Sequence, residues 1–248
     1  MYRFRITYQL QLIITGEFIM PGNNQIRYED QHLTVRDISL SFRKKRVLEH
    51  ISFEAASHDC VGIVGRNGSG KSTLLSILAG ISKPASGSFQ CGGHEMFREK
   101  SLFPRMIGYL PQENPLLEDL TAMDNLRLWY GRRVPDDLPV LDELLLREML
   151  PLKVKALSGG MKRRLAIACA VAEGQRILIL DELTSALDLY QKEIIGGYIR
   201  SYTEQGGIVI LSTHDEQEIR MCSTLFYLEN AKMREIGAEE AITLLKGA

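Results

Sequence analysis

Two segments alternate apolar and polar residues, which is the pattern of a strand with one buried face. Residues 38–42 alternate before a basic turn at 43–46, and residues 51–55 alternate after it. Side chains two positions apart lie on the same side of a strand, so each segment has one apolar side. The two segments therefore predict an antiparallel pair of strands.

Short apolar runs predict further strands at 60–65, 176–180 and 207–211. The last two are continuous, which suits strands buried on both faces of a parallel sheet. Residues 71–80 and 184–204 have helical spacing, so one helix follows the first run and another lies between the last two. The order strand, helix, strand predicts βαβ units.

The segment 114–156 differs in composition and pattern, with Leu and acidic residues at helical spacing. It predicts a small helical lobe, after which a helix continues through 165–173. The end of the chain predicts a strand or two and a closing helix. The expected fold class is α/β, with a mostly parallel sheet, an N-terminal antiparallel β subdomain and an inserted helical subdomain.

Composition and charge reduce the number of functional classes to which the chain could belong. The 248 residues include 30 Lys and Arg against 31 Asp and Glu, for a formal net charge of −1. This balance gives no sign of a nucleic-acid binder, and we expect no nucleic-acid partner. No run of 18 or more apolar residues is present, which predicts that the chain does not span a membrane. The four cysteines and five histidines show no metal-ligand spacing, which favours reduced thiols in a cytosolic protein.

The sequence GRNGSGKS at 65–72 fits the pattern G-x-x-x-x-G-K-[ST] between a predicted strand and a predicted helix. Its glycines let backbone N–H groups curl around phosphate oxygens, and the helix N-terminus adds partial positive charge. Lys71 can reach the β- and γ-phosphates, and the Ser72 hydroxyl can ligate Mg²⁺. The sequence therefore predicts a phosphate-binding P-loop of an NTPase, with a glycine-rich turn as the alternative.

Acidic residues and a histidine end two of the predicted strands. RILILDE at 176–182 places Asp181 and Glu182 at a strand end, and IVILSTHD places His214 just beyond another. Ligands of open α/β sheets bind outside these carboxyl ends. Asp181 would hold Mg²⁺, Glu182 would orient or deprotonate the attacking water, and His214 could donate to the γ-phosphate. A solvated acidic strand end is the alternative.

The segment LSGGMKRR at 157–164 is a poor start for a helix. Gly costs about 1 kcal/mol relative to Ala in a helix. Cations near a helix N-terminus cost roughly 0.3–1 kcal/mol. The segment therefore indicates a function other than stability, with Lys162, Arg163 and Arg164 as a plain solvated face the alternative.

In order along the chain, these motifs resemble those of the nucleotide-binding subunits of ATP-binding cassette (ABC) transporters over residues 33–240. GRNGSGKST matches the Walker A loop, RILILDE the Walker B strand and LSGG the family signature. Gln112 matches the Q-loop, SALD at 185–188 the D-loop and His214 the switch histidine. Phe42 falls where the family places an aromatic residue that stacks on adenine. The P-loop is shared by many NTPases, whereas the signature joined to it is specific.

The resemblance implies a division of the chain into an N-terminal extension and an ABC ATPase domain. The extension is 1–32, with a start at Met20 as one explanation, and the ATPase domain is 33–240. The helical subdomain is about 114–156, and 241–248 is a C-terminal tail.

The motifs and the resemblance together predict ATP and Mg²⁺ as ligands and three groups of site residues. The expected nucleotide-binding residues are Phe42, Gly65, Arg66, Asn67, Gly68, Ser69, Gly70, Lys71, Ser72, Thr73, Ser158, Gly159, Gly160 and Asp188. The expected metal ligands are Ser72, Gln112 and Asp181. The expected catalytic residues are Glu182, His214, Gln112 and Lys71.

The resemblance also explains the signature segment. In the family two subunits meet head to tail, which implies that Ser158 and Gly160 donate to ATP held by the P-loop of the partner. The chain departs from the commonest family pattern in three places. Met161 replaces a glutamine, Leu183 replaces a proline, and Phe42 replaces a tyrosine, which keeps the stacking ring without its hydroxyl.

The expected function is an ATPase subunit in which ATP-driven dimer closure powers export through separate integral membrane subunits. The second ATPase subunit would be another copy or a paralogue, and the location cytoplasmic, peripheral at the inner face of the cell membrane. The form LSGGMKRR resembles exporters, and Trp129 is a candidate contact with membrane subunits, with core packing the alternative. One alternative function is a soluble ABC-type ATPase in macromolecular assembly, for example of iron–sulfur clusters. Another is a binding module that has lost catalysis.

Overall fold

A computed structural model describes residues 31–246 apart from 44, 131–133, 173 and 185–186. The predicted extension therefore lies outside the described residues except at its last two positions. The same holds for the first two residues of SALD and for the last two of the predicted tail. None of the helices in the described part of the chain is long and apolar enough to cross a membrane.

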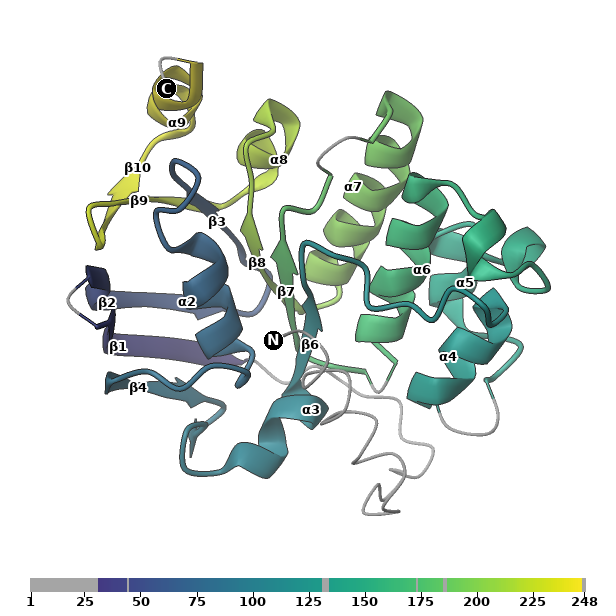
Figure 1. The fold of residues 1–248 in the computed structure, drawn as a ribbon, viewed down its shortest axis with the longest axis horizontal. Coiled ribbons are helices and arrows are strands. Elements are labelled where there is room, and N and C mark those ends of the chain that lie inside the picture. The colour runs from purple at the N-terminus through teal and green to yellow at the C-terminus, as the bar shows by residue number, and fades with distance from the viewer. Residues whose placement is uncertain (1–30, 44, 131–133, 173, 185–186, 247–248) are drawn as a thin grey trace.

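Two sheets form the frame of the molecule (Figure 1). The first is antiparallel, in the order β2 (Lys45–Ala56), β1 (His32–Phe42), β4 (Ser86–Cys91) and β5 (His94–Glu95). The second has the order β10 (Lys232–Ile236), β9 (Thr224–Glu229), β3 (Cys60–Val64), β8 (Ile208–Ser212), β7 (Ile177–Asp181) and β6 (Ile107–Leu110). Its strands pair in parallel except at β10. The predicted antiparallel pair and the predicted parallel strands are both confirmed.

Helices connect and cover these strands. The α-helices are α2 (Lys71–Leu78), α3 (Phe103–Met106), α4 (Ala122–Tyr130), α5 (Pro139–Glu143), α6 (Gly159–Ala170), α7 (Leu189–Glu204), α8 (Glu216–Met221) and α9 (Ala238–Lys246). Short 3₁₀ helices lie at η1 (Lys100–Leu102), η2 (Arg147–Met149) and η3 (Val154–Ala156). Helices α4 and α5 and the two later 3₁₀ turns lie within the predicted helical lobe.

The parallel sheet separates two apolar cores. Alternate residues of β7 and β8 point to opposite faces, as the twofold repeat of a strand requires. Ile177, Ile179, Ile208 and Ile210 pack with α2 and the antiparallel sheet. Leu178, Leu180, Val209 and Leu211 pack with α6, α7 and the lobe. Helix α2, which follows the P-loop, and helix α6, which begins with the signature, therefore cover opposite faces of the sheet (Figure 1).

Two expectations from the sequence are wrong in detail, and one alternative is excluded for two of its three residues. The helix predicted over 184–204 begins at Leu189, because the Asp188 carboxylate caps it by accepting the Gln191 N–H at 2.9 Å. The helix predicted through 165–173 ends at Ala170. Arg163 and Arg164 are only 4% and 6% exposed and form no solvated face, because backbone carbonyls replace water around both guanidiniums.

Candidate active site

The P-loop connects β3 to α2 and leaves the N-terminus of α2 open to an anion. Gly70 is the N-cap, has a φ of +114°, and provides no side-chain acceptor for the first N–H groups of the helix. A Cβ at Gly70 would lie 2.9 Å from the carbonyl oxygen of Val47, so the position requires glycine on two counts. By contrast, a side-chain oxygen caps each of α6, α7 and α8. The uncapped α2 N-terminus therefore fits a phosphate group.

Lys71, the first residue of α2, is buried beneath the loop. Its Nζ donates to the carbonyl oxygens of Gly65 at 2.7 Å and Arg66 at 3.2 Å. Burial lowers the pKa of the Lys71 amine, while the charges of Glu182 and Asp181 oppose that shift. The adjacent Ser72 side chain is exposed and free to ligate a cation. The loop thus carries an amine and a hydroxyl, the kinds of group that bind a nucleoside triphosphate and Mg²⁺ in P-loop proteins.

Asp181 is the last residue of β7, Glu182 follows it, and the two residues share one hydroxyl. Ser212 pairs with Asp181 in the register of β7 and β8. The Ser212 hydroxyl donates to Asp181 Oδ1 at 2.6 Å and accepts the backbone N–H of Glu182 at 2.9 Å. Glu182 has a φ of +48°, a conformation that residues other than glycine seldom adopt. The hydroxyl therefore orients an aspartate and holds the turn on which the glutamate is placed.

The Glu182 carboxylate is the centre of the predicted catalytic group. It accepts a hydrogen bond from Gln112 Nε2 at 2.7 Å, and its other oxygen lies 3.6 Å from His214 Nε2. Burial and the nearby Lys71 amine lower the pKa of His214, and Glu182 opposes the shift. The structure thus brings Gln112 and His214, which stand 70 and 32 positions from Glu182 in the sequence, to the same carboxylate. Their groups can orient or deprotonate water beside the P-loop.

Phe42 lies at the end of β1, and the signature lies at the start of α6. Phe42 ends β1 with 59% of its surface exposed, which leaves a ring face open for stacking. Ser158 caps α6 by accepting the Met161 N–H at 3.2 Å, and its hydroxyl proton remains available for donation. Among the described residues no hydrogen bond joins Ser158, Gly159 or Gly160 to the P-loop. Helix α6, which begins with the signature, packs on the face of the sheet opposite α2.

Tight packing explains one signature glycine. A Cβ at Gly160 would lie 2.4 Å from the Gln191 side chain in the first turn of α7, whereas Gly159 faces open space. Lys162 forms an ion pair with Glu118 at 2.6 Å, so it belongs to the surface between α6 and the lobe. Trp129 is partly buried and packs against the core of the lobe, which agrees with the alternative that it is a packing residue.

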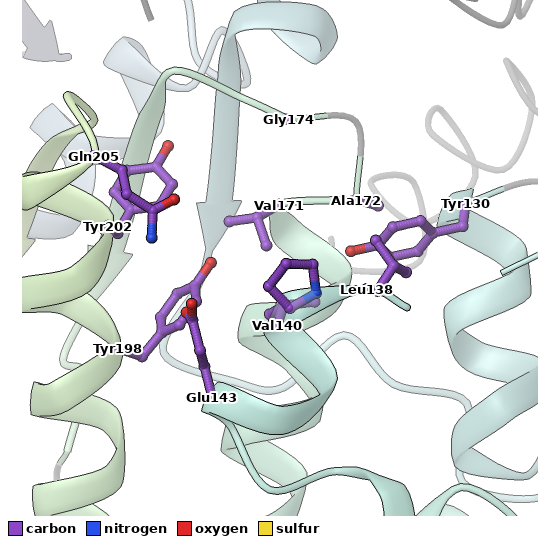
Figure 2. A pocket seen from close by; sticks show the side chains of 11 residues that line it. Tyr130, Leu138, Val140, Glu143, Val171, Ala172, Gly174, Tyr198, Tyr202 and Gln205 are labelled. Atoms are coloured by element: carbon purple, nitrogen blue, oxygen red, sulfur yellow. The ribbon is translucent and has the colours of Figure 1, made fainter. Parts of the chain in front are cut away.

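A hollow of about 190 Å³ lies between the lobe and α7, away from these groups (Figure 2). Tyr198 and Tyr202 on α7 face Val140 and Glu143 of α5 across it. None of the predicted site residues lines this hollow.

Two residues of the site were not singled out from the sequence. Ser212 could have been found by aligning the runs ILILD and IVILS as parallel neighbours, because their ends then lie side by side. Arg163 donates to the carbonyl oxygens of Asp181 and Leu183, and a basic run after LSGG gives no signal of this contact.

The P-loop, the acidic strand end and the parallel sheet define a P-loop NTPase. The chain belongs to the ABC transporter family, whose model matches residues 48–185. It is 32% identical to Nod factor export ATP-binding protein I of Sinorhizobium fredii, over 86% of the chain and 64% of that protein. It is 31% identical to the linearmycin resistance ATP-binding protein of Bacillus subtilis, over 84% of the chain and 69% of that protein. The chain therefore spans about two thirds of the length of these relatives.

Solved structures support the same assignment. A dimeric ATP-binding cassette in a post-hydrolysis state with ADP and Pi matches with a TM-score of 0.74 and 25% identity, over 83% of this chain and 98% of that chain. A nucleotide-free cassette from an ABC transporter matches with a TM-score of 0.75 over 88% and 96% of the two chains; at 20% identity, it supports the fold alone. The predicted fold class is thereby confirmed.

Proposed function

We propose that this chain is the ATP-hydrolysing subunit of an exporter, in which ATP-driven dimer closure powers transport through separate integral membrane subunits. The observation that carries the proposal is the cluster of Gln112, Glu182 and His214 beside the buried amine of Lys71. The relatives named for Nod factor export and linearmycin resistance support the direction of transport.

The P-loop residues would bind the triphosphate. Backbone N–H groups of 65–73 and the N-terminus of α2 would surround the phosphates, and the Lys71 amine would leave its two carbonyl partners to reach them. The Phe42 ring would stack on adenine. Mg²⁺, held by Ser72, Asp181 and Gln112, would neutralise charge that develops on the phosphates.

Glu182 would act on the attacking water. Its carboxylate can accept a proton or orient the water once Gln112 turns from it toward the metal. Because burial lowers the pKa of His214, the imidazole is neutral at pH 7, and a neutral imidazole can donate one hydrogen bond to the γ-phosphate. Ser212 would hold Asp181 and the Glu182 backbone in place during the reaction.

The signature would act in the site of a second subunit, either a copy of this chain or a paralogue. Ser158 and the N–H groups at Gly159 and Gly160 lie at the N-terminus of α6, on the face of the sheet opposite α2. A head-to-tail dimer would bring the N-terminus of α6 to the partner's γ-phosphate. The negative charge of that phosphate would offset the unfavourable placement of basic residues at this helix terminus. Asp188, which caps α7 beside the signature, would border the same interface.

The membrane partners are tested by co-purification. Tagged Glu182→Gln would be trapped with ATP in the source cells, solubilised in mild detergent and analysed for bound proteins. We expect an integral membrane protein, which would place the chain at the inner face of the cell membrane. Recovery of soluble assembly proteins alone would contradict the transport proposal and leave the ATPase chemistry standing. The matched control is Lys71→Met, which should not trap ATP.

A further inference from the structure

A single guanidinium joins the signature helix to the catalytic residues of the same chain. Arg163 lies in α6, five positions after the capping Ser158, and is only 4% exposed. All three of its side-chain nitrogens donate hydrogen bonds. Five of the six acceptors are backbone carbonyl oxygens, and none is a carboxylate.

The acceptors belong to two segments that are far apart in sequence. Nη1 donates to the carbonyl oxygens of Pro111 at 2.7 Å and Gln112 at 3.3 Å, and to the Asn114 side chain at 3.3 Å. On the other side, Nη2 donates to the carbonyl oxygens of Asp181 at 2.7 Å and Glu182 at 3.1 Å, and Nε to that of Leu183 at 2.9 Å.

These two segments are the ones whose side chains meet in the active site. Gln112 Nε2 donates to Glu182 Oε2 at 2.7 Å. Arg163 therefore donates to the backbone carbonyl oxygens of both residues whose side chains form this pair. Glu182 also has the unusual φ of +48°, and its carbonyl is held by the guanidinium while its N–H is held by Ser212. The position of the catalytic carboxylate therefore depends on a residue of the signature helix.

The chemistry of the guanidinium suits this task. Its planar group presents five N–H donors in a fixed geometry, whereas a lysine ammonium is a single point with three donors. Burial lowers the pKa of Arg163 to about 10, and the group stays charged at neutral pH. A lysine at this position could keep the charge but could not reach both segments with the same geometry.

We propose that Arg163 is a positioning residue that couples the signature helix to Gln112 and Glu182, so that contacts made at the start of α6 set the geometry of the chain's own hydrolytic group. The proposal rests on the proposed function, because it assigns to Arg163 an effect on ATP hydrolysis. Arg163 touches neither nucleotide nor water in this account and acts only through the two segments.

The neighbouring residue provides a matched control. Arg164 is on the same helix, is 6% exposed, and donates to the carbonyl oxygens of Leu144 at 2.8 Å and Leu145 at 3.3 Å in the lobe. It therefore has similar exposure and similar acceptors, but these hydrogen bonds go to the lobe and not to the two segments that Arg163 holds. Arg163→Lys and Arg164→Lys differ mainly in which backbone segment loses its guanidinium.

The first experiment measures kcat and KM for ATP, together with thermal unfolding, for both variants. A 1 Å displacement in an active site can lower a rate by about 100-fold, so Arg163→Lys should lower kcat by about that factor with little change in KM. Both variants should lower the melting temperature by a comparable amount. Arg164→Lys should nevertheless leave kcat close to that of the wild type. Equal kcat values for the two variants at equal loss of stability would overturn the proposal.

The second experiment does not depend on hydrolysis. Hydrogen–deuterium exchange of the nucleotide-free proteins should rise at 112–114 and 181–183 together in Arg163→Lys, and at 144–145 in Arg164→Lys. Unchanged exchange at the first two segments would overturn the coupling. If the wild type shows no hydrolysis, the proposed function fails, and the exchange result alone still decides the role of Arg163.

Discussion

Replacing Ser212 by alanine removes one hydroxyl that serves two groups of the active site. Ser212 has no exposed surface, and its hydroxyl donates to the Asp181 carboxylate and accepts the Glu182 N–H. Asp181 is itself only 2% exposed, so water cannot easily replace either bond. A buried polar group left without a partner costs about 1–3 kcal/mol, and a bond to a charged group is worth about 1.5–3 kcal/mol. We therefore expect Ser212→Ala to reduce the free energy of unfolding by about 3 kcal/mol.

The assay is thermal unfolding without nucleotide, followed by the rate of ATP hydrolysis. In a chain of this size 1 kcal/mol corresponds to about 2–4 °C, so the melting temperature should fall by about 6–12 °C. The matched control is Ser76→Ala, since Ser76 is also buried but hydrogen-bonds only the neutral Thr73 carbonyl and the Ser82 hydroxyl. That control should lose about 1 kcal/mol. Equal losses for the two variants would refute the argument that Ser212 supports a charged group, as would a Ser212→Ala protein with wild-type kcat.

Three further changes test other parts of the account. Phe42→Ala should raise KM for ATP about tenfold with little change in kcat, because base stacking is worth about 1–3 kcal/mol, whereas Phe42→Tyr should keep the wild-type KM; steady-state kinetics that show no difference would remove Phe42 from the site. Gly160→Ala should lower the melting temperature, because its Cβ would meet Gln191 at 2.4 Å, while Gly159→Ala, which faces open space, should not; equal melting temperatures would contradict this packing. Burial raises the pKa of Glu218 above its ordinary value, so the folded protein binds more protons there than the unfolded chain and loses stability as pH rises from about 4.5 through the folded pKa. Glu218→Gln should therefore gain stability relative to the wild type between pH 5 and pH 8 in denaturant titrations, and a constant difference across that range would count against the assignment.

Much of the frame follows from short-range pattern. The continuous apolar runs before Asp181 and His214 indicate buried parallel strands, and the glycine spacing before Lys71 indicates a P-loop, because both depend on residues that are neighbours in sequence. For the same reason the sequence places Glu182 and His214 at candidate positions. Gln112 follows only from the resemblance to the family, and the structure brings the three residues together.

Other features depend on contacts that no local pattern reports. The helical pattern predicts a start at 184, five residues before α7 begins, because the residues ahead of Leu189 continue the pattern and only the Asp188 cap marks the true start. The residue types of Arg163 and Arg164 favour the surface, because cations are seldom buried. Only the tertiary structure supplies the carbonyl oxygens that accept from their guanidiniums. Cys60 and Cys222 stand 162 positions apart, yet their sulfur atoms lie 3.8 Å from each other, and both are free thiols.

The central claim is that one chain holds only half of each hydrolytic site and that ATP joins two cassettes. Light scattering of Glu182→Gln at saturating Mg·ATP tests it most directly, because this variant should bind ATP without consuming it. The account predicts a particle of twice the 28.0 kDa chain mass, which reverts to one chain mass when Lys71→Met is added to the variant. A Glu182→Gln protein that binds ATP and stays at 28.0 kDa would contradict a composite site built from two copies of this chain.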